Sequence, residues 1–281
     1  MSLLDRPAAD TQVTHGQRLW LYVAVGLILA FLVAPTLIVV PMSFSASDYL
    51  EFPPREWSLR WYRAYFGSDA WRDATVMSVK VALLTVAAAT PLGTAAAYGL
   101  HVSRFGWARP IYAVLGLPIM VPLILLAIGL FFVYIRLGLA NTVAGLVLAH
   151  TMLAIPYVVV MVAAGLKSYD MNQEMVARSL GAGRLTAFLT VTLPQIRVSV
   201  VSGALFAFIT SFDEVLIAMF VSSGPQSTLT RRMFLSLRDT IDPTIAAIST
   251  CLIVLSVLLL GAAQIFGGGR AFIGAQGERK G

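Results

Sequence analysis

The stretch MNQEMVARSLGAGRLTAFLTVTLPQI, residues 171–196, interrupts the second half of an otherwise very apolar chain. Its pattern predicts two short helices joined at Gly181-Ala182-Gly183, with the second helix over residues 184–193. Pro194 then removes a backbone donor and bends the chain into the next apolar segment. Ala177 and Gly181 are four residues apart, so we expect them to share one helix face that allows close contact with another protein. This segment, called the knuckle below, has the character of a compact docking surface.

The composition places the knuckle on a membrane protein. Of 281 residues, 58% are hydrophobic and 12% are charged, whereas about a quarter of the residues in a soluble domain are charged. The mean hydropathy is +0.81. The single cysteine, Cys251, lies in an apolar run and cannot form an internal disulfide. The net charge of +6 is spread over several loops, which is typical of a membrane protein and does not indicate a nucleic-acid partner.

Six apolar segments have roughly the 20 residues that a helix needs to cross a bilayer. We therefore predict an all-α membrane protein with six transmembrane helices, and with the knuckle between the fourth and the fifth. The segments are Leu19–Met42 and residues 74–100, 110–135, 140–166, 198–221 and 244–266. They form one six-helix transmembrane domain, residues 19–266, between an N-terminal segment (1–18) and a C-terminal tail (267–281) that we expect to be cytoplasmic.

Several of these segments carry residues with local consequences. Residues 1–18 are too long and too acidic for the head of a signal peptide, so we expect the first span to stay uncleaved. Pro118 and Pro122 predict local unwinding of the third span, which neighbouring helices can satisfy. His150 in the fourth span is expected to make a hydrogen bond between helices.

Two longer polar loops lie on the same side of this topology. Residues 43–73 are rich in aromatic residues, which suit the boundary between water and lipid, and residues 59–66 predict a short surface helix. Residues 222–243 contain an amphipathic pattern over residues 230–238. With the N-terminus inside, the inner segments carry eleven Lys and Arg and the outer segments eight, with Lys80 in the membrane. This bias predicts a cytoplasmic N-terminus and a cytoplasmic knuckle.

An acidic pair, Asp213 and Glu214, lies in the middle of the fifth span. A carboxylate at mid-bilayer costs about 2.5–3.5 kcal/mol on insertion scales. The two residues are about 100° apart around a continuous helix, so both cannot face the same direction. One interpretation is a water-filled path that attracts cations, with Thr210, Ser211 and Phe212 beside the pair adding hydrogen bonds and a cation–π face. The other is a buried structural pair, satisfied by backbone groups, by Lys80 or by His150.

The knuckle resembles the cytoplasmic motif of the permease subunits of binding-protein-dependent ABC importers. That motif reads Glu-Ala-Ala, three residues, Gly, nine residues, Ile, any residue, Leu-Pro. The matching positions are Met175-Val176-Ala177, Gly181, Val191 and Leu193-Pro194. The motif glutamate is Met175 in this chain, and Glu174 stands one residue earlier.

The chain is most similar to the second permease of spermidine/putrescine importers. The supporting stretches are SLRWY at residues 58–62, SFDE at 211–214, Arg238, and DPTIAAIST at 242–250. Relatives in this subgroup also carry opines, 4-aminobutyrate and aminoethylphosphonate.

The resemblance implies that residues 19–266 are a transmembrane permease domain, with the knuckle as its cytoplasmic coupling helix between helices 4 and 5. It also implies a division of labour between chains. A second, different permease would complete the pathway, and a dimer of ATPase subunits would hold ATP and Mg and grip the knuckle at Glu174, Met175, Ala177, Gly181, Leu193 and Pro194. A periplasmic or extracellular substrate-binding protein would deliver cargo to the outer loops, and Asp213, Glu214, Ser211 and Phe212 would line the path. The chain itself would be no enzyme and hold no cofactor, and it contains no Gly-rich Lys-Ser/Thr phosphate loop. The location implied is the bacterial inner membrane.

Three functions therefore compete. The first is an importer permease for a small cationic amine such as spermidine or putrescine. The second is the same class of importer with a zwitterionic or anionic cargo. The third is an ion-coupled transporter or channel that acts alone, since carboxylates within membranes also occur in proton relays. A membrane enzyme or a metal site is disfavoured, because no His/Asp/Glu cluster with ligand spacing occurs in the sequence.

Overall fold

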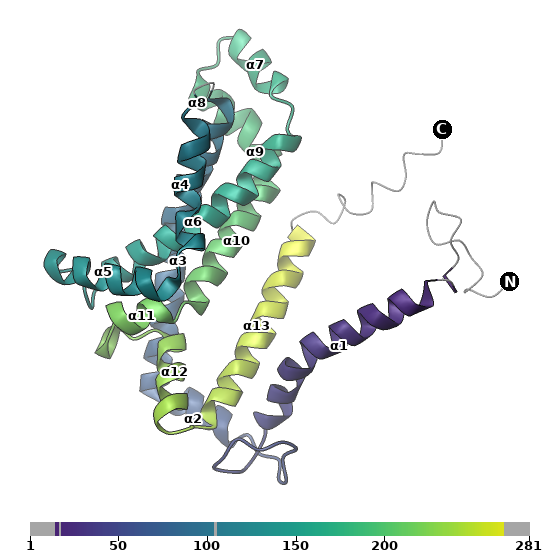
Figure 1. The fold of residues 1–281 in the computed structure, drawn as a ribbon, viewed down its shortest axis with the longest axis vertical. Coiled ribbons are helices and arrows are strands. Elements are labelled where there is room, and N and C mark those ends of the chain that lie inside the picture. The colour runs from purple at the N-terminus through teal and green to yellow at the C-terminus, as the bar shows by residue number, and fades with distance from the viewer. Residues whose placement is uncertain (1–14, 17, 104–105, 267–281) are drawn as a thin grey trace. The chain divides into compact units, whose positions relative to one another are not determined.

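A computed structural model describes residues 15–16, 18–103 and 106–266. Within these ranges all regular secondary structure is helical, and the only β pairing is an isolated bridge between Ser45 and Trp57. The chain divides into two compact units. Figure 1 labels the helices. The first comprises Met1–Gly67 and Ile241–Ser256, and the second Ser68–Thr240 and Val257–Gly281. The expected tail at residues 267–281, like residues 1–14, lies outside the described residues.

The first unit contains α1 (Leu19–Met42), α2 (Arg60–Gly67) and the beginning of α13 (Thr244–Phe266). Helices α1 and α13 begin and end where the apolar runs predict, and α2 confirms the short helix expected in the first polar loop. That loop is held by its own side chains. The Ser43 and Tyr62 hydroxyls are 2.8 Å apart, and the Trp61 indole N–H donates to the Ser47 carbonyl at 3.1 Å.

The core of the second unit is made by three helices, α3 (Asp69–Val102), α6 (Val143–Ser168) and α10 (Arg197–Asp213). Small residues allow them to approach closely. A Cβ added at Gly93 of α3 would lie 2.7 Å from the Val158 side chain of α6, and one at Gly203 of α10 would lie 3.2 Å from the Val158 Cα. Helices in membranes associate largely through such close packing, because the hydrophobic effect does not drive helices together within lipid.

Two spans that the apolar pattern predicts as continuous are broken. The third span divides into α4 (Ala108–Met120) and α5 (Leu123–Leu137), and the Pro110–Met120 part is bent by 98° against α5. This break at Val121-Pro122 confirms the unwinding expected from the prolines. The fifth span divides into α10 and α11 (Leu216–Val221). The expectation of one continuous helix over residues 198–221 was therefore wrong, and the break falls on the acidic pair.

The number of helices able to span a membrane is smaller than the six predicted. In the described part of the chain three unbroken helices are long and apolar enough, α1, α3 and α6. The number rises to five if each of two bent pairs counts as one span. Six spans therefore remain a prediction. The second polar loop contains α12 (Leu229–Asp239), which confirms the amphipathic helix expected there.

The knuckle consists of α7 (Asn172–Ser179), then α8 (Arg184–Ala187), a π-helical turn (Phe188–Thr192) and α9 (Leu193–Gln195). The predicted pair of helices and their junction are confirmed, although the second helical piece continues to Gln195 rather than stopping at Leu193. The chain bends by 81° between Arg184–Gln195 and α10, directly after Pro194.

Candidate functional site

The acidic pair is separated by the break in the fifth span. Asp213 is the last residue of α10, and Glu214 leaves the helix with extended backbone angles, φ −68° and ψ 123°. Asp213 is exposed, whereas Glu214 is only 5% exposed. One carboxylate of the pair is thus buried among protein groups, and the other is open.

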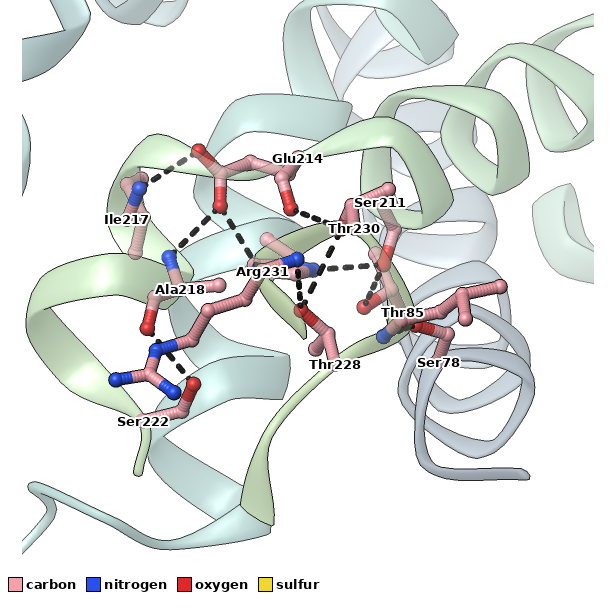
Figure 2. Close-up of polar contacts among 12 residues, drawn as sticks. Ser78, Thr85, Ser211, Glu214, Ile217, Ala218, Ser222, Thr228, Thr230 and Arg231 are labelled. Atoms are coloured by element: carbon pink, nitrogen blue, oxygen red, sulfur yellow. Dashed lines mark hydrogen bonds and ion pairs between the residues drawn. The ribbon is translucent and has the colours of Figure 1, made fainter. Parts of the chain in front are cut away.

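Glu214 satisfies backbone groups of α11, the helix that follows the break. Its Oε1 accepts the Ile217 N–H at 2.7 Å and its Oε2 accepts the Ala218 N–H at 2.9 Å (Figure 2). Its carbonyl oxygen accepts the Thr230 hydroxyl from α12 at 3.0 Å. The first N–H groups of a helix have no partner within the helix, and an unsatisfied group in a membrane costs several kcal/mol. Glu214 therefore makes the break tolerable.

A buried polar chain braces Glu214 from the neighbouring helices. The imidazole Nδ1 of His150 on α6 is 2.8 Å from the Ser211 hydroxyl. The Ser211 hydroxyl donates to the Thr85 hydroxyl on α3 at 3.3 Å (Figure 2). The His150 Nε2 is 3.6 Å from the Glu214 Oε2. His150 thus makes the contact between helices that its position predicts. Lys80, the other proposed partner, is exposed and makes no ion pair among the described residues.

Both breaks line one cavity of about 670 Å³. Asp213 is the exposed charged group in its wall, and no basic residue contributes to it among the residues described. Ser211 and Phe212 are not part of this wall: Ser211 is buried in the polar chain, and Phe212 stacks on Phe208 with ring centroids 5.6 Å apart. The lining residues are Pro118, Ile119, Met120, Val121, Pro122, Leu123, Leu153, Tyr157, Ile209, Thr210, Asp213, Glu214, Val215 and Leu216.

Tyr157 is the aromatic residue that the sequence did not single out. It lines the cavity from α6 and stacks on Phe206 of α10, with centroids 6.4 Å apart and planes 8° apart. It lies seven residues after His150, so both stand on one face of α6. That spacing was available in the sequence as a signal.

Gly181 is required by the backbone of the knuckle. Helix α7 ends at Ser179, and Gly181 follows with φ +95°. Its N–H donates to the Arg178 carbonyl and the Ala182 N–H donates to the Ala177 carbonyl, both at 3.1 Å. These two bonds form a Schellman cap, in which glycine is favoured because the left-handed conformation strains other residues. The expectation that Ala177 and Gly181 share one helix face was wrong, because the helix ends between them.

Glu174 is an internal brace of the knuckle. Its carboxylate is 2% exposed and accepts hydroxyl hydrogen bonds from Tyr98 of α3 and Thr192 of the π-helical turn, both at 2.6 Å. Met175, at the position of the motif glutamate, is 53% exposed. Leu193 is half-buried and Pro194 exposed. The outer surface of the knuckle is therefore apolar around Met175, with Leu180 85% and Leu185 71% exposed.

The helical fold, the broken spans and the knuckle together define an ABC importer permease, and comparison with known proteins agrees. Residues 89–269 match the family described as "Binding-protein-dependent transport system inner membrane component". Because the match covers more than half of the chain, the protein belongs to this family.

Within this family, the chain is similar to permeases that are named for polyamine transport. The chain is 31% identical to the spermidine/putrescine transport system permease protein PotC of Haemophilus influenzae, over 84% of this chain and 91% of that protein. It is 32% identical to the putrescine transport system permease protein PotI of Escherichia coli, over 93% and 92%. A chain in the crystal structure of a bacterial ABC transporter that imports the acidic polysaccharide alginate has the same fold, with a TM-score of 0.75, 14% identity, and coverage of 90% and 98%.

Proposed function

We propose that this chain is one of two permeases in an ABC importer that carries a small cationic amine, such as spermidine or putrescine, into the cell. The observation that carries the cargo assignment is the cavity at the two breaks, where Asp213 is exposed and no basic side chain is present among the described lining residues. The 31% and 32% identical relatives carry polyamine names.

The chemistry of the wall suits an ammonium group. A carboxylate and an ammonium at about 4 Å attract each other by about 1 kcal/mol in water and by about 4 kcal/mol near a protein surface. Tyr157 offers an aromatic ring that can face the methylene chain or the cation of the cargo. Most of the other lining side chains are apolar, so the amine is held weakly enough to leave again.

The proposal includes the remaining parts of the importer, and membership of the family supports it. A different permease chain completes the pathway, and two ATPase subunits, which bind ATP and Mg, grip the knuckle of each permease. A substrate-binding protein loads the outer loops. The N-terminus and the knuckle are cytoplasmic, and the permease spans the inner membrane six times. ATP-driven closure of the ATPase dimer shifts the permeases between inward-open and outward-open packings.

The test is uptake of labelled spermidine and putrescine by the reconstituted complex, with and without ATP. We expect ATP-dependent uptake that unlabelled polyamine competes and that 4-aminobutyrate and aminoethylphosphonate do not. ATP-dependent uptake of a zwitterion instead would keep the importer and remove the cationic cargo. Uptake by the purified chain alone, without ATP, would indicate an ion-coupled transporter or channel.

Asp213→Asn tests the cargo site directly. Removing the charge while keeping the shape should raise the KM for putrescine about tenfold, which corresponds to about 1.4 kcal/mol. The maximal rate should change less. An unchanged KM would show that the carboxylate does not contact the cargo.

A further inference from the structure

Two adjacent carboxylates at the break in the fifth span have different surroundings, and only one is free for a ligand. Asp213 faces the cavity, while both oxygens of Glu214 accept N–H groups from the first turn of α11. Val215, which occupies the cap position of α11, offers no side-chain acceptor. The N–H groups of Ile217 and Ala218 would have no acceptor in this cap if Glu214 did not provide one.

We propose that Glu214 is a positioning residue: by occupying the N-terminal turn of α11 it keeps the Asp213 carboxylate in the cavity and available to the cargo. Without Glu214, the two N–H groups of Ile217 and Ala218 would be unsatisfied beside the cavity wall. Asp213, the neighbouring carboxylate in the chain, would then turn toward them. A carboxylate that accepts backbone N–H groups at a helix start is stabilised there. Asp213 would then be withdrawn from the cargo.

The rest of the polar chain fixes Glu214 in this role. His150 approaches the Glu214 Oε2 from α6, whereas Thr230 of α12 binds only the main-chain carbonyl of Glu214 and not its carboxylate. His150 is itself held through Ser211 and Thr85. Together with the Ile217 and Ala218 N–H groups, His150 therefore holds the Glu214 carboxylate at the first turn of α11. The effect of Glu214 on the cargo is therefore indirect.

This inference rests on the proposed cationic cargo, and it makes a distinctive prediction for transport kinetics. In the assembled importer, Glu214→Ala should raise the KM for putrescine about tenfold, as Asp213→Asn does, and weaken the preference for a cation over 4-aminobutyrate. The double variant should have the KM of Asp213→Asn alone, because a carboxylate already removed cannot be withdrawn. Glu214→Gln keeps an oxygen that accepts one of the two N–H groups, so its KM should stay within about twofold of the wild type.

Thr230→Val is the matched control. It disturbs the same break by removing the hydroxyl that binds the Glu214 carbonyl, and it leaves both carboxylates in place. It should lower the yield or thermal stability of the complex without changing the KM or the cation preference. An equal rise in KM in this variant would mean that any damage to the break has this effect, and the inference would be overturned.

The remaining outcomes separate this inference from the proposed function. If Asp213→Asn raises the KM and Glu214→Ala lowers only the maximal rate or the yield, Glu214 is merely structural and the inference fails alone. If the KM effects of the two substitutions multiply, or if Glu214→Gln alone matches Asp213→Asn, Glu214 acts on the cargo itself and the inference again fails alone. If Asp213→Asn has no effect on the KM, the cationic site and this inference fall together. Should Glu214→Ala not assemble, Glu214→Gln and Thr230→Val still decide.

Discussion

At the scale of single residues, the acidic side chains near the knuckle and the break lie in two opposite environments, buried and exposed. Glu174 and Glu214 are carboxylates that would be expected to face water, yet each is buried and accepts two hydrogen bonds. Asp213 is the carboxylate left open. Hydrogen bonds to a charged group contribute about 1.5–3 kcal/mol each, so the buried glutamates stabilise the two least regular parts of the second unit, the knuckle and the break.

Gly181 gives a prediction at this scale. Gly181→Ala places a Cβ at φ +95° and should destabilise the cap of α7 by about 1–2 kcal/mol. The knuckle would then open about five to thirty times more often, which follows from tenfold per 1.4 kcal/mol. Tryptic cleavage at Arg178 and Arg184, followed by mass spectrometry of the complex in nanodiscs, should accelerate accordingly.

Gly183→Ala provides the control for that experiment. Gly183 has φ −63°, and the nearest atom to an added Cβ, the Thr186 hydroxyl oxygen, is 4.0 Å away. This substitution should leave the cleavage rate unchanged. If the two variants are cleaved alike, the left-handed backbone is not what makes Gly181 necessary.

The sequence predicted the roles of some residues and not of others for a physical reason. The contact of His150 with a neighbouring helix could be predicted, because a polar side chain is costly at any position in a membrane span unless it finds a partner. The separation of Asp213 from Glu214 does not follow, because it depends on a cap in which Glu214 reaches past Val215 and Leu216 to the N–H groups of Ile217 and Ala218. His150 and Thr230 also contact Glu214, and they are 64 and 16 residues away from it in the sequence.

At the scale of helices, the apolar pattern was reliable where a helix is long and unbroken. Helices α1 and α13 have the predicted bounds, since composition alone defines a run of apolar residues. The break between α4 and α5 was signalled by proline. The break between α10 and α11 contains neither proline nor glycine, so no helix-breaking residue revealed it in the sequence.

Helix α12 gives a prediction at this scale, since it is part of an outer loop in the proposed topology. Arg231 and Arg232 line a cavity of about 340 Å³ and make no ion pair in the described structure. Arg232 lies over the Trp71 ring, 5.1 Å from its centroid, and burial lowers the pKa of the Arg231 guanidinium. Two guanidinium groups without carboxylate partners favour an acidic side chain of the substrate-binding protein.

Replacing both arginines with glutamine should therefore weaken binding of the substrate-binding protein to the importer in nanodiscs by about tenfold, and should reduce the dependence of that binding on salt. Arg238→Gln on the same helix is the control. Arg238 is exposed and already donates to Asp239 at 2.7 Å, an interaction that lowers the pKa of the Asp239 carboxyl. The control should bind as the wild type does. Equal loss in both would point to net charge rather than to this surface.

At the scale of the whole molecule, the proposed topology can be tested by labelling from each side of the membrane. The chain has one cysteine, so a Cys251→Ser background accepts single new thiols. Tyr49 in the first polar loop is 76% exposed, and Leu180 in the knuckle is 85% exposed. We expect a membrane-impermeant maleimide added to spheroplasts to label Tyr49→Cys and not Leu180→Cys. The pattern should reverse in inside-out vesicles. Labelling of both from one side would contradict the six-span arrangement.

The length of α3 has a mechanical consequence. It is a single helix of 34 residues, roughly 51 Å long at 1.5 Å per residue. Near one end Tyr98 is bonded to Glu174 of the knuckle, and toward the other Ser78 accepts the Leu229 N–H of α12. One continuous helix, which contains Pro91, thus joins the part that ATPase subunits would pull to the part that would meet the delivered cargo. In the proposed topology, a displacement of the knuckle at one membrane face would reach the opposite face through this helix, without a loop between them.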